Sequence, residues 1–264
     1  MAQKGFEYEE NAYYILEKYD IVTGGVAGAS SQVNDLTLKN KAKKKTGCEL
    51  KISPTAGGSL VMKYINGKWY YGDFEGVEEK EFLHSIGEEY NLLKEMNTSG
   101  PHGKNWRGKV PALQNDIRGK KMLVGASTKQ EAYTADIARF GGDNEVHIKV
   151  PAKAICDYYI TKKCSYINVG THGFFTLSDK DELGLNKKLV SMKQPKIPDF
   201  SNSADCMIRV RCQPKGGGDY QFVMTLQFGN VKKSPYNIAP LKKGSSSIID
   251  AVALKKDPLL LSFS

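Results

Sequence analysis

Asp35, Glu49 and Lys51 are two acids and an amine spaced so that they could act on one phosphate ester. Hydrolysis of a phosphodiester needs a hard cation held by oxygen ligands, an oriented water molecule, and positive charge that offsets the transition state. Two carboxylates can hold the cation, and a lysine can position or polarise the water. This set of residues therefore indicates metal-dependent cleavage of a phosphodiester bond.

Two short strands would bring these side chains together. Residues 33–38 and 48–52 both alternate between polar and apolar positions, and a lysine-rich connection joins them. If the strands pair, period-2 geometry places Asp35, Glu49 and Lys51 on one face and the leucines on the other. We expect Mg²⁺, with Mn²⁺ as a substitute, bound by Asp35, Glu49 and the main-chain carbonyl of Leu50. The same spacing also fits a solvated, charged sheet face, so this alternative stays open.

The rest of the chain mixes helix and strand signals. Residues 5–19 predict a first helix with Tyr8, Ala12, Ile15 and Tyr19 on one face. Residues 60–71 predict a hairpin that turns at Asn66-Gly67. Helices are expected at 77–96 and 129–139, and strands at 158–160, 165–169, 174–177, 206–213 and 222–228. We expect a single domain over 1–264, with a catalytic core at 1–98, a DNA-recognition portion at 99–240 and a C-terminal segment at 241–264.

Composition and charge narrow the class of protein. The formal net charge is +9, from 38 Lys and Arg against 29 Asp and Glu, which favours phosphate-rich partners. No apolar run approaches the ~18 residues that span a bilayer, and the N-terminus carries no apolar secretory segment. The five cysteines form no CxxC pair, so we expect reduced thiols in a cytoplasmic protein.

Several cationic segments are candidates for DNA contact. Arg209, Arg211 and Gln213 alternate on one face of a predicted strand, and such side chains can pair with guanine and adenine in the major groove. The glycine-rich loop that begins at Lys215 follows this strand. Further candidates for phosphate contact are Lys43, Lys44, His102, Lys104 and Arg107. The alternative for each segment is a solvated surface, and for the loop that contains Trp106 it is a surface loop with Trp106 anchored in the core.

These residues resemble the PD-(D/E)XK nuclease superfamily. The resemblance lies in a helix opened by Gly5-Phe6 with Glu9, then Asn34-Asp35, then Glu49-Leu50-Lys51, with Asn34 where the family usually has proline. Within the superfamily, the chain is most similar to small type II restriction endonucleases that cut a GCGC site. The segment from Ile208 to Gly217 and Leu226-Gln227-Phe228 look like the base-reading hairpin of those enzymes. Residues 75–150 have no counterpart in this resemblance.

The resemblance implies an α/β (α+β) fold, with a central mixed sheet flanked by helices and a strand-rich C-terminal half. It also implies divalent metal and a catalytic role for Glu9, which otherwise fits an acid favoured near a helix N-terminus. The expected function is a type II restriction endonuclease that cuts double-stranded DNA at a short palindrome. It would act as a homodimer or a monomer, beside a cognate DNA methyltransferase. The alternatives are a structure-specific repair nuclease or junction resolvase, and a non-catalytic basic nucleic-acid-binding protein.

Overall fold

The computed structural model describes residues 2–25, 34–54, 56–65, 68–98, 145–214, 220–250 and 257–263. The chain forms two compact units, each assembled from separate segments of the sequence. Unit 1 comprises residues 1–55, 151–206 and 228–264, and unit 2 comprises residues 56–150 and 207–227. Within the described residues the strands form two five-stranded sheets, so the expected mixture of helices and strands is confirmed.

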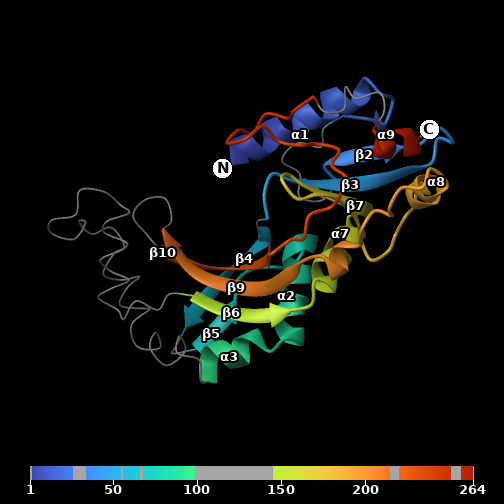
Figure 1. The fold of residues 1–264 in the computed structure, drawn as a ribbon. Helices are drawn as coiled ribbons and strands as arrows, with labels where there is room; N and C mark the ends of the chain where they lie inside the picture. The colour runs from blue at the N-terminus through green and yellow to red at the C-terminus, as the bar shows by residue number, and fades with distance from the viewer. Residues whose placement is uncertain are drawn as a thin grey trace. The chain divides into compact units, whose positions relative to one another are not determined.

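Unit 1 is built on a mixed sheet in the order β1-β2-β3-β7-β8 (Figure 1). Its strands are β1 (Val22–Thr23), β2 (Leu36–Lys39), β3 (Lys45–Lys51), β7 (Cys164–Val169) and β8 (Gly173–Thr176). The predicted pairing of β2 with β3 is confirmed: they run antiparallel, with Leu36 opposite Cys48 and Lys39 opposite Lys45. β3 also pairs in parallel with β7, so β3 has a hydrogen-bonded neighbour on both sides.

Helices complete unit 1. They are α1 (Ala2–Glu17), α7 (Lys153–Thr161), α8 (Leu185–Ser191), the 3₁₀ turn η1 (Phe200–Asn202) and α9 (Pro258–Ser262). Tyr8, Ala12 and Leu16 of α1 are buried against the apolar face of β2 and β3. Leu16 takes the place that the sequence pattern gave to Ile15, which is only partly buried. Helix α1 thus covers the leucine face, as the period of its apolar residues predicts.

A buried polar network joins α1 to β7. Asn168, which is fully buried, donates to the Tyr8 hydroxyl at 3.0 Å and accepts from the N–H of Ile238 at 3.2 Å. The Tyr8 hydroxyl donates in turn to the carbonyl of Ala239 at 2.9 Å. Because unpaired polar groups are costly inside a protein, this network fixes α1 firmly on the sheet.

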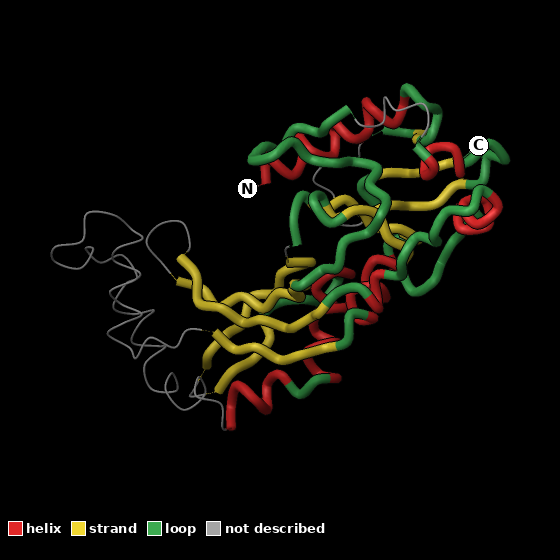
Figure 2. Tube along the Cα trace, viewed as in Figure 1, coloured by secondary structure: helices red, strands yellow, loops and turns green. Residues whose placement is uncertain are grey.

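Unit 2 holds the second sheet, in the order β5-β4-β10-β9-β6, whose strands are seen side by side in Figure 2. Its strands are β4 (Ala56–Ile65), β5 (Lys68–Tyr71), β6 (Glu145–Val150), β9 (Asp205–Pro214) and β10 (Tyr220–Gly229). The start of β9, up to Cys206, and the end of β10, from Phe228, are assigned to unit 1. The helices α2 (Glu78–Glu89) and α3 (Leu92–Thr98) pack on β4 and β5. The predicted hairpin over residues 60–71 is confirmed as β4 and β5.

The structure corrects two predicted elements. The single helix expected over 77–96 is interrupted after Tyr90, because Asn91 adopts a left-handed conformation (φ 54°), which asparagine tolerates at a helix end. The strand expected at 158–160 is wrong, since these residues belong to helix α7. The helix expected at 129–139 lies outside the described residues.

Two further predictions concern cysteines and membranes. Cys48, Cys156, Cys164 and Cys206 are free and buried, as expected of reduced thiols that pack as small apolar groups. Among the helices that the structure describes, none combines the length and the apolar composition needed to cross a bilayer.

Candidate active site

Asp35 sits directly before β2 and is tied to the neighbouring strand. Its Oδ2 accepts a hydrogen bond of 2.7 Å from the main-chain N–H of Leu50. Burial raises the pKa of Asp35 to about 8, and the negative charge of Glu49 raises it further, whereas the positive charge of Lys51 and the hydrogen bond from Leu50 lower it. The two strands therefore bring Asp35 to the sheet face that carries Glu49 and Lys51, as the alternation predicts.

Glu49 is the most enclosed acid of this face. Only 2% of it is exposed, because β3 lies between β2 and β7 and residues on both sides of the strand are buried. Its Oε1 lies 2.5 Å from Nζ of Lys51, whereas its Oε2 is buried and has no hydrogen-bond partner in the part of the chain that the structure describes. A buried carboxylate oxygen without a partner is energetically costly, so it marks a place where a bound cation would relieve the cost.

Lys51 is held as a cation. Burial alone lowers the pKa of its amine, but Glu49, Tyr159 and Asp35 together raise it well above the ordinary value. The Nζ atom also lies 5.4 Å from the centroid of the Tyr159 ring, within the range of a cation–π contact. An amine in this state donates hydrogen bonds and offsets negative charge, and it does not act as a general base.

Glu9 reaches the same site from helix α1. Burial raises the pKa of its carboxyl to about 7, with the charge of Lys51 lowering it and that of Glu49 raising it further. Glu9 in turn raises the pKa of Asp35. One electrostatically coupled group is therefore formed by Glu9, Asp35, Glu49 and Lys51, and we call it the catalytic cluster. It includes Glu9, the helix residue suggested by the resemblance.

Tyr159 is a member of the site that the sequence analysis missed. It is fully buried in α7, and burial raises the pKa of its hydroxyl far above the usual value, while the charge of Lys51 opposes that rise. The missed signal is the buried set Ala154, Ile155, Tyr158 and Tyr159, which recurs at helical spacing. The strand predicted at residues 158–160 lies within this helical pattern.

The donors of the catalytic cluster suit a magnesium ion. Among the described residues, no group of three or more His, Cys, Asp and Glu side chains has the geometry to hold a metal ion. Magnesium, however, is commonly bound by one or two carboxylates, with waters and a substrate phosphate completing its shell. Asp35, the open Oε2 of Glu49 and the main-chain carbonyl of Leu50 fit this smaller set.

The candidate base-reading strand lies in unit 2. Ile208 and Val210 of β9 are buried, and Arg209 and Arg211 face the other way, so the predicted alternation is confirmed. Arg209 donates from Nε to Oε2 of Glu145 at 2.9 Å and from its terminal nitrogen to Oε1. Arg211 is 44% exposed and lies 3.9 Å from the same carboxylate. In this structure the guanidinium of Arg209 is therefore bound by the carboxylate of Glu145.

The remaining candidate DNA contacts are only partly described. Lys43 is exposed at the tip of the β2–β3 hairpin, and Lys44 forms an ion pair of 3.0 Å with Glu182. Nothing is described of the Gln213 side chain. Lys215, His102, Lys104 and Arg107 lie outside the described residues, together with Trp106.

Comparisons of the chain with protein-family models, with curated proteins and with solved structures gave no match.

Proposed function

We propose that this protein is a magnesium-dependent endonuclease that cleaves double-stranded DNA, with Asp35, Glu49 and Lys51 at its centre. The observation that carries the proposal is the buried Glu49 carboxylate, in which one oxygen contacts Lys51 and the other has no partner among the described residues. A solvated sheet face, the expectation for a non-catalytic binding protein, would leave this acid in water. The 2% exposure of Glu49 counts against that alternative.

Each residue has a role that follows from its surroundings. Asp35 and Glu49, with the Leu50 carbonyl, would hold Mg²⁺, or Mn²⁺ in its place. When bound, such an ion binds the phosphate oxygens and makes water a better nucleophile. Lys51 stays charged, so it donates a hydrogen bond to the attacking water and offsets the negative charge on the phosphate. Glu9, whose pKa is about 7, can hold or release a proton near neutral pH beside this water.

The finer proposal is a type II restriction endonuclease with a restriction-endonuclease-like core. It is supported by the mixed sheet of unit 1 and by the alternating arginines of β9, which belong to the hairpin expected to read bases. Such an enzyme would act in the cytoplasm on a short palindrome, as a homodimer or a monomer. A cognate DNA methyltransferase would protect the same site.

A second candidate is a structure-specific nuclease with the same catalytic cluster. It is favoured by the ion pair between Arg209 and Glu145, because this contact engages one of the two arginines expected to read guanine. Such an enzyme would cut branched or mismatched DNA with little sequence preference.

Digestion of a sequenced plasmid tests both candidates. Wild type is compared with Asp35→Asn and with the matched control Asp179→Asn, which changes an exposed acid of unit 1. We expect magnesium-dependent cutting by wild type and the control, and a loss of about 100-fold or more in Asp35→Asn. Discrete bands indicate a restriction enzyme, whereas cutting confined to four-way or mismatched substrates indicates the second candidate. Equal cutting by all three proteins overturns the assignment of the site.

A further inference from the structure

Beside the catalytic cluster, unit 1 has an open hollow of about 420 Å³. Its lining includes the amine-bearing residues Lys45, Lys163 and Lys180. Asn34, which directly precedes Asp35, and Gly47 of β3 also line it. We call this feature the lysine hollow.

Two residues of the lysine hollow, Gly47 and Lys45, lie on the sheet face that carries the catalytic cluster. Thr37 pairs with Gly47 and Lys39 with Lys45, so the alternation that points Asp35 and Glu49 to this face also points Gly47 and Lys45 to it. Glu49 lies four positions after Lys45 on β3, which corresponds to about 13 Å along the strand. At 3.4 Å per nucleotide, a DNA strand advances about four nucleotides over that distance.

The floor of the hollow is closely packed around Gly47. A Cβ atom added there would lie 2.8 Å from the carbonyl oxygen of Lys163 and 2.8 Å from Cβ of Asn34. Glycine therefore lets the turn after α7 approach β3 and keeps Lys163 close to the strand that carries Lys45. The geometry of the hollow is set by backbone contacts rather than by mobile side chains.

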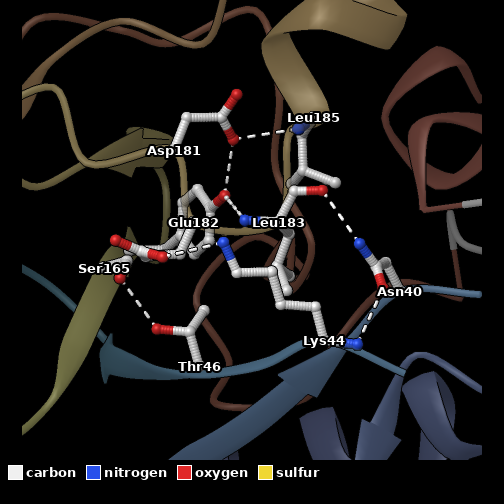
Figure 3. Close-up of polar contacts among 9 residues, drawn as sticks. Asn40, Lys44, Thr46, Ser165, Asp181, Glu182, Leu183 and Leu185 are labelled. Atoms are coloured by element: carbon white, nitrogen blue, oxygen red, sulfur yellow. Dashed lines mark hydrogen bonds and ion pairs between the residues drawn. The ribbon is translucent and has the colours of Figure 1, made fainter. Parts of the chain in front are cut away.

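The acids at or near the rim of the hollow already have partners within the protein, as Figure 3 shows. Glu182 pairs with Lys44, with 3.0 Å between Oε2 and Nζ. Asp181 accepts from the Tyr166 hydroxyl at 2.6 Å and from the N–H of Leu185 at 2.9 Å. On the floor, the hydroxyls of Thr46 and Ser165 lie 2.8 Å apart, which offers a polar surface without added charge.

The three lysines, by contrast, have no acidic partner among the described residues. Lys45, Lys163 and Lys180 are all exposed, and none forms an ion pair with any residue in the described part of the chain. Three uncompensated cations around one concave surface attract a polyanion whose charges are spaced along its length.

We propose that the lysine hollow binds the phosphate backbone of duplex DNA about four nucleotides from the bond that is cut. This proposal rests on the proposed nuclease function and extends it, because it assigns a substrate-holding surface outside the catalytic cluster. The lysines contact phosphates and read no bases, so they hold every duplex alike.

The slope of DNA affinity against salt concentration tests the proposal. The hollow variant is Lys45→Gln, Lys163→Gln and Lys180→Gln in one chain. The control is Lys18→Gln, Lys187→Gln and Lys242→Gln, which removes the same charge from exposed positions of unit 1 outside the hollow. Fluorescence anisotropy with a labelled duplex, without divalent metal, gives the dissociation constant between about 50 and 200 mM salt.

Each lost phosphate contact lowers the slope of log affinity against log salt by about 0.9, so the hollow variant is expected to lose about 2.7 and the control almost nothing. Single Gln variants should each lose about a third of this. An unchanged slope in the hollow variant, or an equal loss in the control, overturns the proposal. These outcomes differ from failure of the nuclease function, in which wild type binds DNA with the expected slope but never cuts it.

Discussion

Nζ of Lys51 lies 2.5 Å from Oε1 of Glu49, and that carboxylate is only 2% exposed. The contact holds Glu49 in one orientation, and within the described ranges it leaves Oε2 without a hydrogen-bond partner. Removing one member of a buried ion pair is far more damaging than replacing both, because the remaining charge stays buried alone. Substitutions of Glu49 and Lys51 therefore test what the pair contributes to stability and to catalysis.

Lys51→Met is expected to abolish cleavage and to lower the free energy of unfolding by about 3 kcal/mol. The double variant Glu49→Gln, Lys51→Met should recover most of the stability and none of the activity, since no unpaired charge remains. Urea unfolding in chelator, for wild type, both single variants and the double variant, gives the coupling free energy. Additive losses would mean that Glu49 and Lys51 do not interact in solution.

Asp35 makes the metal-free protein sensitive to pH. Its pKa is raised to about 8 in the folded state, so between about pH 4 and pH 8 the folded protein keeps a proton that the unfolded chain has released. This contribution to stability is present at low pH and is lost as the pH rises toward 8. Asp35→Asn removes the dependence and should stabilise the protein more at pH 8 than at pH 5.

The stabilisation by Asp35→Asn is expected to be larger at pH 8 than at pH 5 by more than about 1 kcal/mol. The full linkage effect would be larger, because it amounts to about 1.36 kcal/mol for each pH unit between these two values. Urea unfolding of wild type and Asp35→Asn in chelator measures it, and Asp179→Asn is the control. An effect of Asp35→Asn that is the same at both pH values would show that the carboxyl titrates normally.

Magnesium should stabilise the folded protein through the same carboxylates. Binding of a ligand to the native state raises the free energy of unfolding by RT ln(1 + [L]/Kd), which reaches about 2.7 kcal/mol at 100 times Kd. Wild type should therefore melt at a higher temperature in Mg²⁺ than in chelator, and Glu49→Gln should lose this increase. If Ca²⁺, Mg²⁺ and K⁺ all raise the melting temperature equally, the effect is ionic strength and not a site.

The catalytic strands could be predicted because their signals are local. Asp35, Glu49 and Lys51 lie within one hairpin, and alternation alone decides which face they share. Glu9 was reached only through a resemblance, since nothing in the period of α1 distinguishes it from the neighbouring acids. Its position near the site follows from the packing of α1 on the sheet, which the sequence of α1 alone does not show.

The parts that could not be predicted depend on pairing between distant segments. β7 follows β3 by more than a hundred residues, and no local pattern shows that Glu49 will face Ile167 across a parallel pair. That pairing is what encloses Glu49 and brings α7, with Tyr159, over Lys51. The boundaries expected at residues 98 and 240 stay predictions, but the compact units are interleaved in sequence because of the same pairing.

Tyr159 is expected to position Lys51 through the face of its ring. Its hydroxyl is buried and has no hydrogen-bond partner among the residues that the structure describes, whereas the ring centroid lies 5.4 Å from Nζ of Lys51. Tyr159→Phe should therefore keep most of the cleavage rate, and Tyr159→Leu should reduce it about tenfold, consistent with a cation–π contact of about 1 kcal/mol and a misplaced amine. Single-turnover cleavage measures both, and equal losses in the two variants would assign the effect to the hydroxyl instead.

Glu145 is expected to compete with DNA for Arg209. Partial burial alone raises the pKa of this carboxyl, but Arg209 and His147 together lower it below its ordinary value, so it stays ionised and paired near neutral pH. Glu145→Gln should free Arg209 and tighten binding to duplex DNA several-fold at low salt, because one cation is gained for phosphates or guanine. Anisotropy titrations of wild type, Glu145→Gln and Glu145→Gln, Arg209→Ala measure this gain. The gain should disappear in the double variant, and if it persists there, the contact with DNA does not run through Arg209.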